Sequence, residues 1–103
     1  MSAPVPGRRW VRASAPHELV LRDFDDGTVL FDCRDGQTHY VNPVASVVLK
    51  RLLETEMGAD DLFAYVERQF AAPLHPEDRT QVLRILSQLE ALKLIRCKQE
   101  SAI

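Results

Sequence analysis

Two Asp-Gly pairs separate three short runs of β-branched, aromatic and aliphatic residues, and they are the strongest local constraint on the fold. The pairs are Asp26-Gly27 and Asp35-Gly36, and glycine supplies the positive φ angle that tight hairpin turns require. Two such turns in succession predict a three-stranded antiparallel meander over Leu19–Phe24, Thr28–Cys33 and Gln37–Val41. Apolar and polar residues alternate in the second and third runs, as expected when one face of the sheet is packed and the other is partly exposed.

Three helices are predicted to follow the sheet, at about residues 43–53, 58–70 and 76–93. Asn42-Pro43 starts the first, because Asn is a strong N-cap and Pro is tolerated at the first helical position. Apolar residues cover most of this helix's circumference, which predicts that it lies at the centre of the core. The acidic pair Asp60-Asp61 lies near the positive end of the second helix.

The length and composition indicate one small domain. The chain has 103 residues, of which 46% are hydrophobic and 27% are charged. A domain of this size buries roughly two-thirds of its unfolded surface, too little for a deep active site together with a cofactor cradle. The sequence also contains no Gly-rich phosphate loop, no Gly-x-Ser-x-Gly elbow and no nucleophile with a recognisable base nearby. We therefore expect a protein that is not an enzyme and that holds no cofactor.

The charge balance argues against nucleic acid and anionic lipid as partners. The 13 Lys and Arg residues oppose 15 Asp and Glu residues, which gives a formal net charge of −2 and no global positive field. No apolar run approaches the ~20 residues that a membrane helix needs, and the N-terminus lacks the apolar stretch of a signal peptide. These features predict a cytoplasmic protein whose partner is another protein or a peptide.

The two ends of the chain are predicted to be irregular. Residues 1–16 are rich in Pro, Ser, Ala, Gly and Arg and show no periodicity, so we expect an N-terminal arm in which Trp10 is the side chain able to dock on the domain. The domain itself is expected at residues 17–97, and residues 98–103 are expected to form a C-terminal tail.

The Cys and His residues do not predict a metal site. Cys33 and Cys97 match neither a redox pair nor a zinc framework, and they are interpreted as small apolar fillers. His39 could be grouped with Cys33 and with His17 or His75, but these side chains are scattered rather than paired, so no metal is expected. The aspartates around the two turns lack the spacing of a calcium loop and are interpreted as turn residues.

The third predicted helix has an unusually wide apolar surface. Its apolar residues spread over about half of the circumference, whereas one packing face needs roughly 100°. The helix then either packs on both the first helix and the sheet, or one flank borders a groove beside the strand at Gln37–Val41. The second hypothesis places Arg79, Leu83 and Leu86 on that flank. An outer strand next to an apolar helix flank suits an extended peptide that adds as a further strand.

These elements and the residues around them resemble the PqqD family. The resemblance rests on the stretch DGQTHYVNPVA at residues 35–45, the apolar helix after it, and the closing pattern LEALKLI at residues 89–95. It covers about residues 17–96. More narrowly, THYVNP at residues 38–43 is similar to the branch encoded beside an HPr-kinase-related protein.

The resemblance implies a winged-helix-like α+β domain of the RiPP recognition element type, which binds the leader segment of a ribosomally synthesised precursor peptide. It also implies a second partner, a modifying enzyme from the same gene cluster, for which the HPr-kinase-related protein is a candidate. Carried onto this sequence, the leader adds to the third strand and rests against the third helix, at Thr38, His39, Tyr40 and Val41 and at Arg79, Val82, Leu83 and Leu86.

Two other functions fit the same order of elements and stay open. A DNA-binding winged-helix regulator is one, although the basic residues of the third helix are balanced by its acidic ones and the domain is not basic. The other is a dimerising module that buries the same strand edge against a second copy of the chain.

Overall fold

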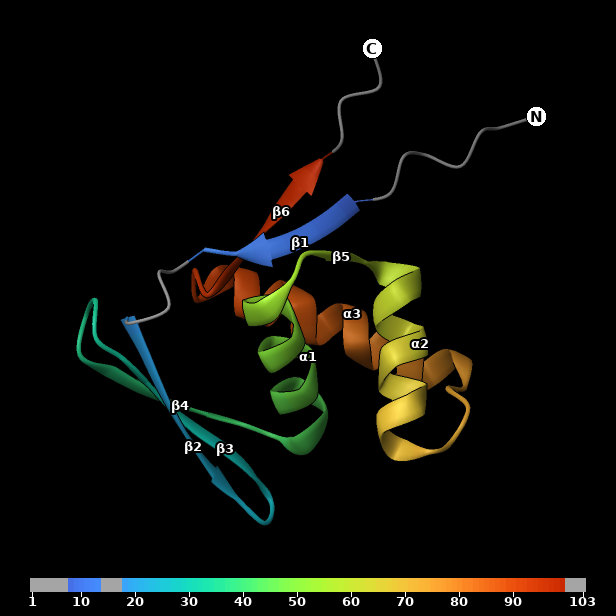
Figure 1. The fold of residues 1–103 in the computed structure, drawn as a ribbon, viewed down its shortest axis with the longest axis horizontal. Coiled ribbons are helices and arrows are strands. Elements are labelled where there is room, and N and C mark those ends of the chain that lie inside the picture. Colours follow the sequence, from blue (N-terminus) through green and yellow to red (C-terminus); the bar gives the residue numbers. More distant parts are fainter. Residues whose placement is uncertain (1–7, 14–17, 100–103) are drawn as a thin grey trace.

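The computed structural model describes residues 8–13 and 18–99, which form a mixed α+β fold (Figure 1). One antiparallel sheet has the order β2-β3-β4 and consists of β2 (Leu19–Phe24), β3 (Gly27–Asp32) and β4 (Gln37–Val41). The other has the order β5-β1-β6 and consists of β1 (Arg8–Arg12), β5 (Met57–Gly58) and β6 (Ile95–Gln99). The helices are α1 (Pro43–Glu54), α2 (Ala59–Phe70) and α3 (Pro76–Ala91). The predicted meander followed by three helices is confirmed.

The two glycines of the meander have the backbone that the turns require. Gly27 has a φ of 150° and Gly36 a φ of 75°, both in the region that favours glycine. Gly27 also lies against the end of β4, because a Cβ atom there would lie 2.3 Å from the carbonyl oxygen of Val41. The first turn therefore needs glycine for both its backbone angle and its packing.

One residue separates β4 from α1. Asn42 caps the helix, with its side-chain oxygen accepting a hydrogen bond from the Ala45 N–H at 2.8 Å, and Pro43 follows at the first helical position. In Figure 1, α1 lies between the β2-β3-β4 sheet and α2, and α3 passes behind it. Val48 and Leu49 of α1 are fully buried, so the prediction that this helix is the centre of the core is confirmed.

Polar side chains on the inner face of the β2-β3-β4 sheet bind the sheet to α1. Thr28 is buried, and its hydroxyl lies 2.8 Å from Asp23 Oδ1 and 2.6 Å from Ser46 Oγ on α1. Lys50 of α1 forms an ion pair with the same Asp23 at 2.6 Å. Since buried polar groups stabilise a fold only when they are hydrogen-bonded, these contacts fix the position of the sheet on the helix.

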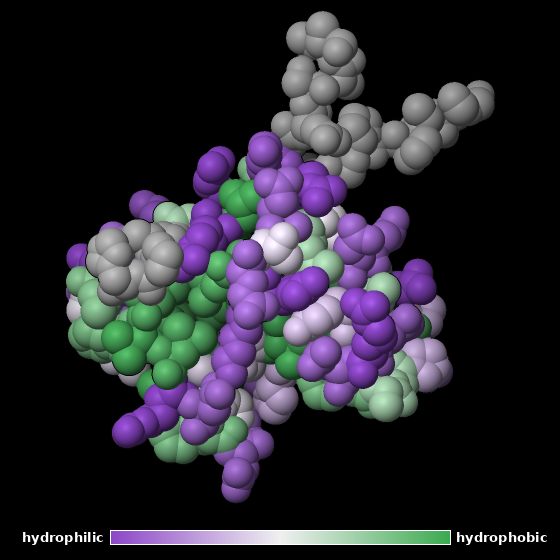
Figure 2. All heavy atoms as spheres, viewed as in Figure 1, coloured by the Kyte–Doolittle hydropathy of each residue, from purple (hydrophilic) through white to green (hydrophobic). Residues whose placement is uncertain are grey.

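The outer face of this sheet carries exposed apolar side chains. Val20, Phe31 and Tyr40 lie on three neighbouring strands and are 56%, 41% and 57% exposed. Figure 2 shows hydrophobic residues gathered on the side of the molecule where this sheet lies. In β3, Thr28, Leu30 and Asp32 thus face inward and Phe31 faces outward. The two inward polar side chains can be buried because both are hydrogen-bonded, Thr28 to Ser46 and Asp32 to Arg34.

The second sheet was not predicted. β1 lies within the N-terminal segment expected to be irregular, and β6 extends into the expected C-terminal tail, so irregular structure is wrong for residues 8–12 and 98–99. Trp10 pairs with Cys97, a separation along the chain that no local pattern reveals. The prediction that Trp10 docks on the domain is confirmed, since its side chain is part of the core.

Other parts of the expected ends, residues 1–7, 14–17 and 100–103, lie outside the described residues, and the division into arm, domain and tail stays an expectation. Cys33 is exposed in the turn after β3 and does not fill the core, whereas Cys97 packs against it. Within the described residues, no helix has both the length and the hydropathy needed to cross a lipid bilayer.

Candidate functional site

The outer strand β4 presents part of its main chain at an open edge. The Cys33 N–H donates to the Glu18 carbonyl at 2.8 Å, which identifies the hydrogen-bonded pairs between β2 and β3. The main-chain N–H and C=O groups of successive residues point to alternate sides of an antiparallel strand. The register between β3 and β4 therefore fixes which residues of β4 point their main-chain groups toward β3. The main chains of Gln37, His39 and Val41 face β3, whereas the N–H and C=O groups of Thr38 and Tyr40 face the open edge. Among the described strands, none pairs with that edge.

A groove of about 490 Å³ lies beside the end of β4. β4, the start of α1 and the second half of α3 line it, with Tyr40, Val41, Asn42, Ala45, Ile85, Gln88, Leu89, Ala91 and Leu92. Val41, Ile85 and Leu89 are buried and make an apolar floor, while Leu92 is partly exposed at the rim. An edge with free N–H and C=O groups next to an apolar groove can bind the main chain and the side chains of an extended segment.

The four predicted strand residues have different positions. Val41 lines the groove, and Tyr40 does so while its hydroxyl donates to the Asp26 carbonyl across the sheet. The side chain of Thr38 is exposed, and that of His39 is half-buried on the inner face. The structure therefore brings Tyr40 and Val41 to the groove, and Thr38 contributes its main chain to the same edge.

The four predicted residues of α3 do not line the groove. Val82 and Leu86 are 1% exposed and belong to the core. The Arg79 guanidinium lies 5.5 Å from the centre of the Phe63 ring on α2. Leu83 is 44% exposed and is not part of the groove wall. The flank with Arg79, Leu83 and Leu86 therefore does not line this groove, because α3 turns its other flank toward β4.

The flank of α3 that lines the groove differs from the one predicted, although the sequence carries a signal for it. Gln81, Ile85, Gln88 and Leu92 follow at helical spacing and share one side of α3. This row carries no charged residue, as suits a surface that faces an apolar groove. The opposite row includes Arg79 and Glu90. The direction in which α3 crosses α1 decides between the two rows, and it depends on contacts far apart in the sequence.

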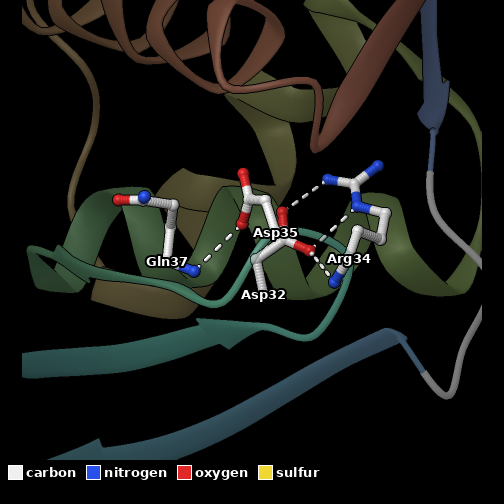
Figure 3. A network of polar contacts seen from close by, with 4 residues as sticks. All are labelled: Asp32, Arg34, Asp35 and Gln37. Carbon is white, nitrogen blue, oxygen red and sulfur yellow. Dashed lines mark hydrogen bonds and ion pairs between the residues drawn. The ribbon is translucent and has the colours of Figure 1, made fainter.

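The turn between β3 and β4 is held by a carboxylate with three donors (Figure 3). Asp32 Oδ1 accepts from the main-chain N–H and from Nε of Arg34, both at 2.9 Å, and Oδ2 accepts from the Arg34 guanidinium at 2.7 Å. Asp35 accepts from the Gln37 N–H at 3.0 Å. These bonds fix the start of β4 and therefore the position of its edge.

The same network affects titration. The Arg34 hydrogen bonds lower the pKa of Asp32 to about 2. Since the unfolded value is roughly 3.9, ionised Asp32 stabilises the folded state fully above about pH 5, and the contribution is lost as the pH falls toward the folded pKa.

We expect Asp32→Asn to lower the free energy of unfolding near neutral pH and to differ less from the wild type at acid pH. Denaturant titrations at about pH 6.5 and about pH 2.5 measure this difference. Hydrogen bonds from Lys50 and Arg9 also lower the pKa values of Asp23 and Glu56, respectively. The free energy of unfolding of the variant is therefore still expected to fall at acid pH, though less than that of the wild type. A difference of the same size at both pH values would contradict the assignment, and Asp35→Asn is the matched control in the same turn.

Metal ligation has no support in the described part of the chain, where no three His, Cys, Asp or Glu side chains are grouped so that they could hold an ion. Of the residues considered from sequence, His39 faces the sheet interior, Cys33 is exposed, and His17 lies outside the described residues.

A family model described as coenzyme PQQ synthesis protein D (PqqD) matches residues 27–95. The chain belongs to the PqqD family. The matched region contains β4, α1 and α3, so every wall of the groove lies within the part of the chain that defines this PqqD family member.

The fold is similar to that of a solved protein with a bound peptide. The structure described as TbiB1 in complex with the TbiA(beta) leader peptide aligns with a TM-score of 0.64 and 17% sequence identity, over 84% of this chain and 95% of that one. At this identity the match establishes the fold alone. No curated protein matches this PqqD family member.

Proposed function

We propose that this protein is a non-catalytic peptide carrier, which binds the leader segment of a ribosomally synthesised precursor and presents it to a modifying enzyme. The observation that carries the proposal is the open edge at Thr38 and Tyr40 beside the apolar groove. Hydrogen bonds to the edge supply affinity that does not depend on the peptide's side chains, and the groove selects apolar side chains.

The fold comparison supports this proposal. TbiB1 was solved with a leader peptide, and its fold covers most of this chain. The open edge at Thr38 and Tyr40 follows from the strand register, and the groove beside it has an apolar lining. Both features fit an extended peptide, the class of ligand bound in the TbiB1 structure.

The finer proposal concerns the enzyme that receives the peptide. The THYVNP stretch at residues 38–43 includes four of the five residues of β4 and the cap of α1, and it is the stretch that resembles the branch encoded beside an HPr-kinase-related protein. We propose such a protein as the modifying partner. A pull-down of the neighbouring kinase-related protein, with and without peptide, tests the assignment directly.

The test of peptide binding is a titration of the full chain, followed by amide and methyl NMR shifts. The probes are synthetic peptides that correspond to the small open reading frames beside the gene. We expect shifts concentrated on Gln37–Val41 and on the groove residues Ile85, Gln88 and Leu92. A folded monomer that shows no shift with any of these peptides would contradict the proposal.

Leu83 on α3 and Leu92 at the C-cap of this helix form a matched pair that distinguishes the two flanks. We expect Leu92→Asn to weaken peptide binding about tenfold, because burial of one leucine side chain contributes roughly 1.5–3 kcal/mol. Leu83→Asn removes a leucine of similar exposure from the other flank and is expected to leave the affinity within about twofold. Isothermal titration of both variants measures the difference, and a larger loss for Leu83→Asn would restore the flank chosen from sequence.

The two alternative functions have distinct signatures. A dimer joined through the β4 edges would sediment as a dimer at micromolar concentrations without peptide, and addition of peptide would dissociate it. A DNA-binding regulator would bind duplex DNA with an affinity that falls steeply with salt. Sedimentation and a salt series with random duplex DNA therefore separate all three functions.

A further inference from the structure

A second cavity lies where α2 ends and α3 begins. Its volume is about 210 Å³, below the roughly 300–1,000 Å³ of pockets that hold a whole small ligand. Aliphatic and aromatic side chains make most of its wall, contributed by Val44, Val66, Phe70, Leu74 and Val82. A cavity of this size and lining suits one apolar side chain.

The cavity has a buried floor and an open rim. Val66 and Val82 are 1% exposed, whereas the Phe70 ring is 44% exposed. The connection from α2 to α3 is fixed, because the Glu67 carboxylate accepts a hydrogen bond from the Leu74 N–H at 2.8 Å. The Phe70 ring thus stands beside a preformed hollow, so a ligand would not have to order the site when it binds.

The cavity continues the groove beside β4. Gln81 lines the cavity and Ile85, one helical turn further along α3, lines the groove. On α1 the consecutive residues Val44 and Ala45 line the cavity and the groove, respectively. The groove and the cavity therefore lie on either side of the first turn of α1. β4 runs toward this turn, since one residue separates the end of β4 from the start of α1.

We propose that this cavity is a second anchor site for the same peptide, which takes one uncharged aliphatic or aromatic side chain from outside the segment that pairs with β4. The proposal rests on the proposed function. A peptide on the β4 edge that continues past Val41 crosses the first turn of α1 and reaches the cavity. Asp78 is part of the lining, which disfavours an acidic side chain there. Specificity then depends on two apolar positions separated by a spacer.

The test uses a display library of random 15-residue peptides selected on the full chain, since this probe requires no knowledge of the natural client. The tightest peptide is then titrated against the wild type and two variants. Ala72→Trp fills the cavity from an exposed position in its wall, and Ala64→Trp places the same side chain on an exposed site of α2 outside it. We expect at least a tenfold loss of affinity for Ala72→Trp and less than a twofold change for Ala64→Trp. The methyl resonances of Val44, Val66 and Val82 are expected to shift with those of Ile85.

The outcomes separate this proposal from the proposed function. Unchanged affinity of Ala72→Trp, together with shifts at Ile85 but none at Val66 and Val82, would overturn the second anchor and leave peptide binding at β4 intact. Failure to select any peptide that shifts β4 or the groove would overturn both. If Ala72→Trp does not fold, Phe70→Ala provides the test, since it removes an exposed ring from the rim. It is expected to weaken the same peptide at least threefold, and unchanged affinity would overturn the anchor.

Discussion

Replacement of Thr38 by proline is expected to reduce peptide affinity at least tenfold. The Thr38 N–H faces the open edge, and proline removes this donor and places its ring where the peptide main chain would lie. One hydrogen bond contributes roughly 0.5–1.5 kcal/mol, and the steric conflict with the ring adds to that loss. Fluorescence anisotropy with a labelled peptide from the NMR titration measures the change.

Thr38→Ala is the matched control, because it removes the exposed side chain and keeps the N–H. Its affinity is expected to stay within about threefold of the wild type. Proline is tolerated on edge strands, so the thermal unfolding temperature of Thr38→Pro is expected to stay near that of Thr38→Ala. Equal affinities of the two variants in a folded protein would show that the peptide does not bind by strand addition.

Gly27→Ala is expected to lower the free energy of unfolding by about 3 kcal/mol or more. Alanine is strained at a φ of 150°, and its Cβ would lie 2.3 Å from the Val41 carbonyl oxygen and 2.7 Å from the Tyr40 hydroxyl. Neither neighbour can move freely, because both belong to β4, and the carbonyl is main chain. Urea denaturation followed by circular dichroism measures the loss.

Gly36→Ala provides the comparison within the same meander. Gly36 also has a positive φ, but a Cβ there would have no heavy atom within 4 Å. We expect this variant to lose only about 1 kcal/mol, the cost of the left-handed backbone alone. Similar losses for the two alanine variants would show that the close approach of Gly27 to β4 contributes little to stability.

The parts of the fold that could be predicted from sequence are those set by neighbouring residues. Gly27, Gly36 and Asn42 each act within a few positions of themselves, through a turn backbone or a helix cap, and they were sufficient to order the meander and to start α1. The open edge of β4 follows from the same local information, since the last strand of a meander has only one sequential neighbour.

The parts that could not be predicted depend on contacts between distant segments. β1 and β6 pair residues such as Trp10 and Cys97 from opposite ends of the chain. The two strands are not joined by a hairpin turn, so no turn motif in the sequence indicates that they pair. The correct flank of α3 depends on how that helix crosses α1. Ile85 and Leu86 are adjacent aliphatic residues and both are buried, yet only Ile85 also lines the groove.

The apolar outer face of the β2-β3-β4 sheet affects the protein when it carries no peptide. Val20, Phe31 and Tyr40 form an exposed surface next to the open edge of β4, and flat apolar sheets with free edges promote aggregation. A peptide bound as proposed would cover that edge and would stabilise the folded state by mass action. On the proposed function, we therefore expect the protein without peptide to be the form more prone to self-association, and its amount in a cell to follow the supply of the peptide.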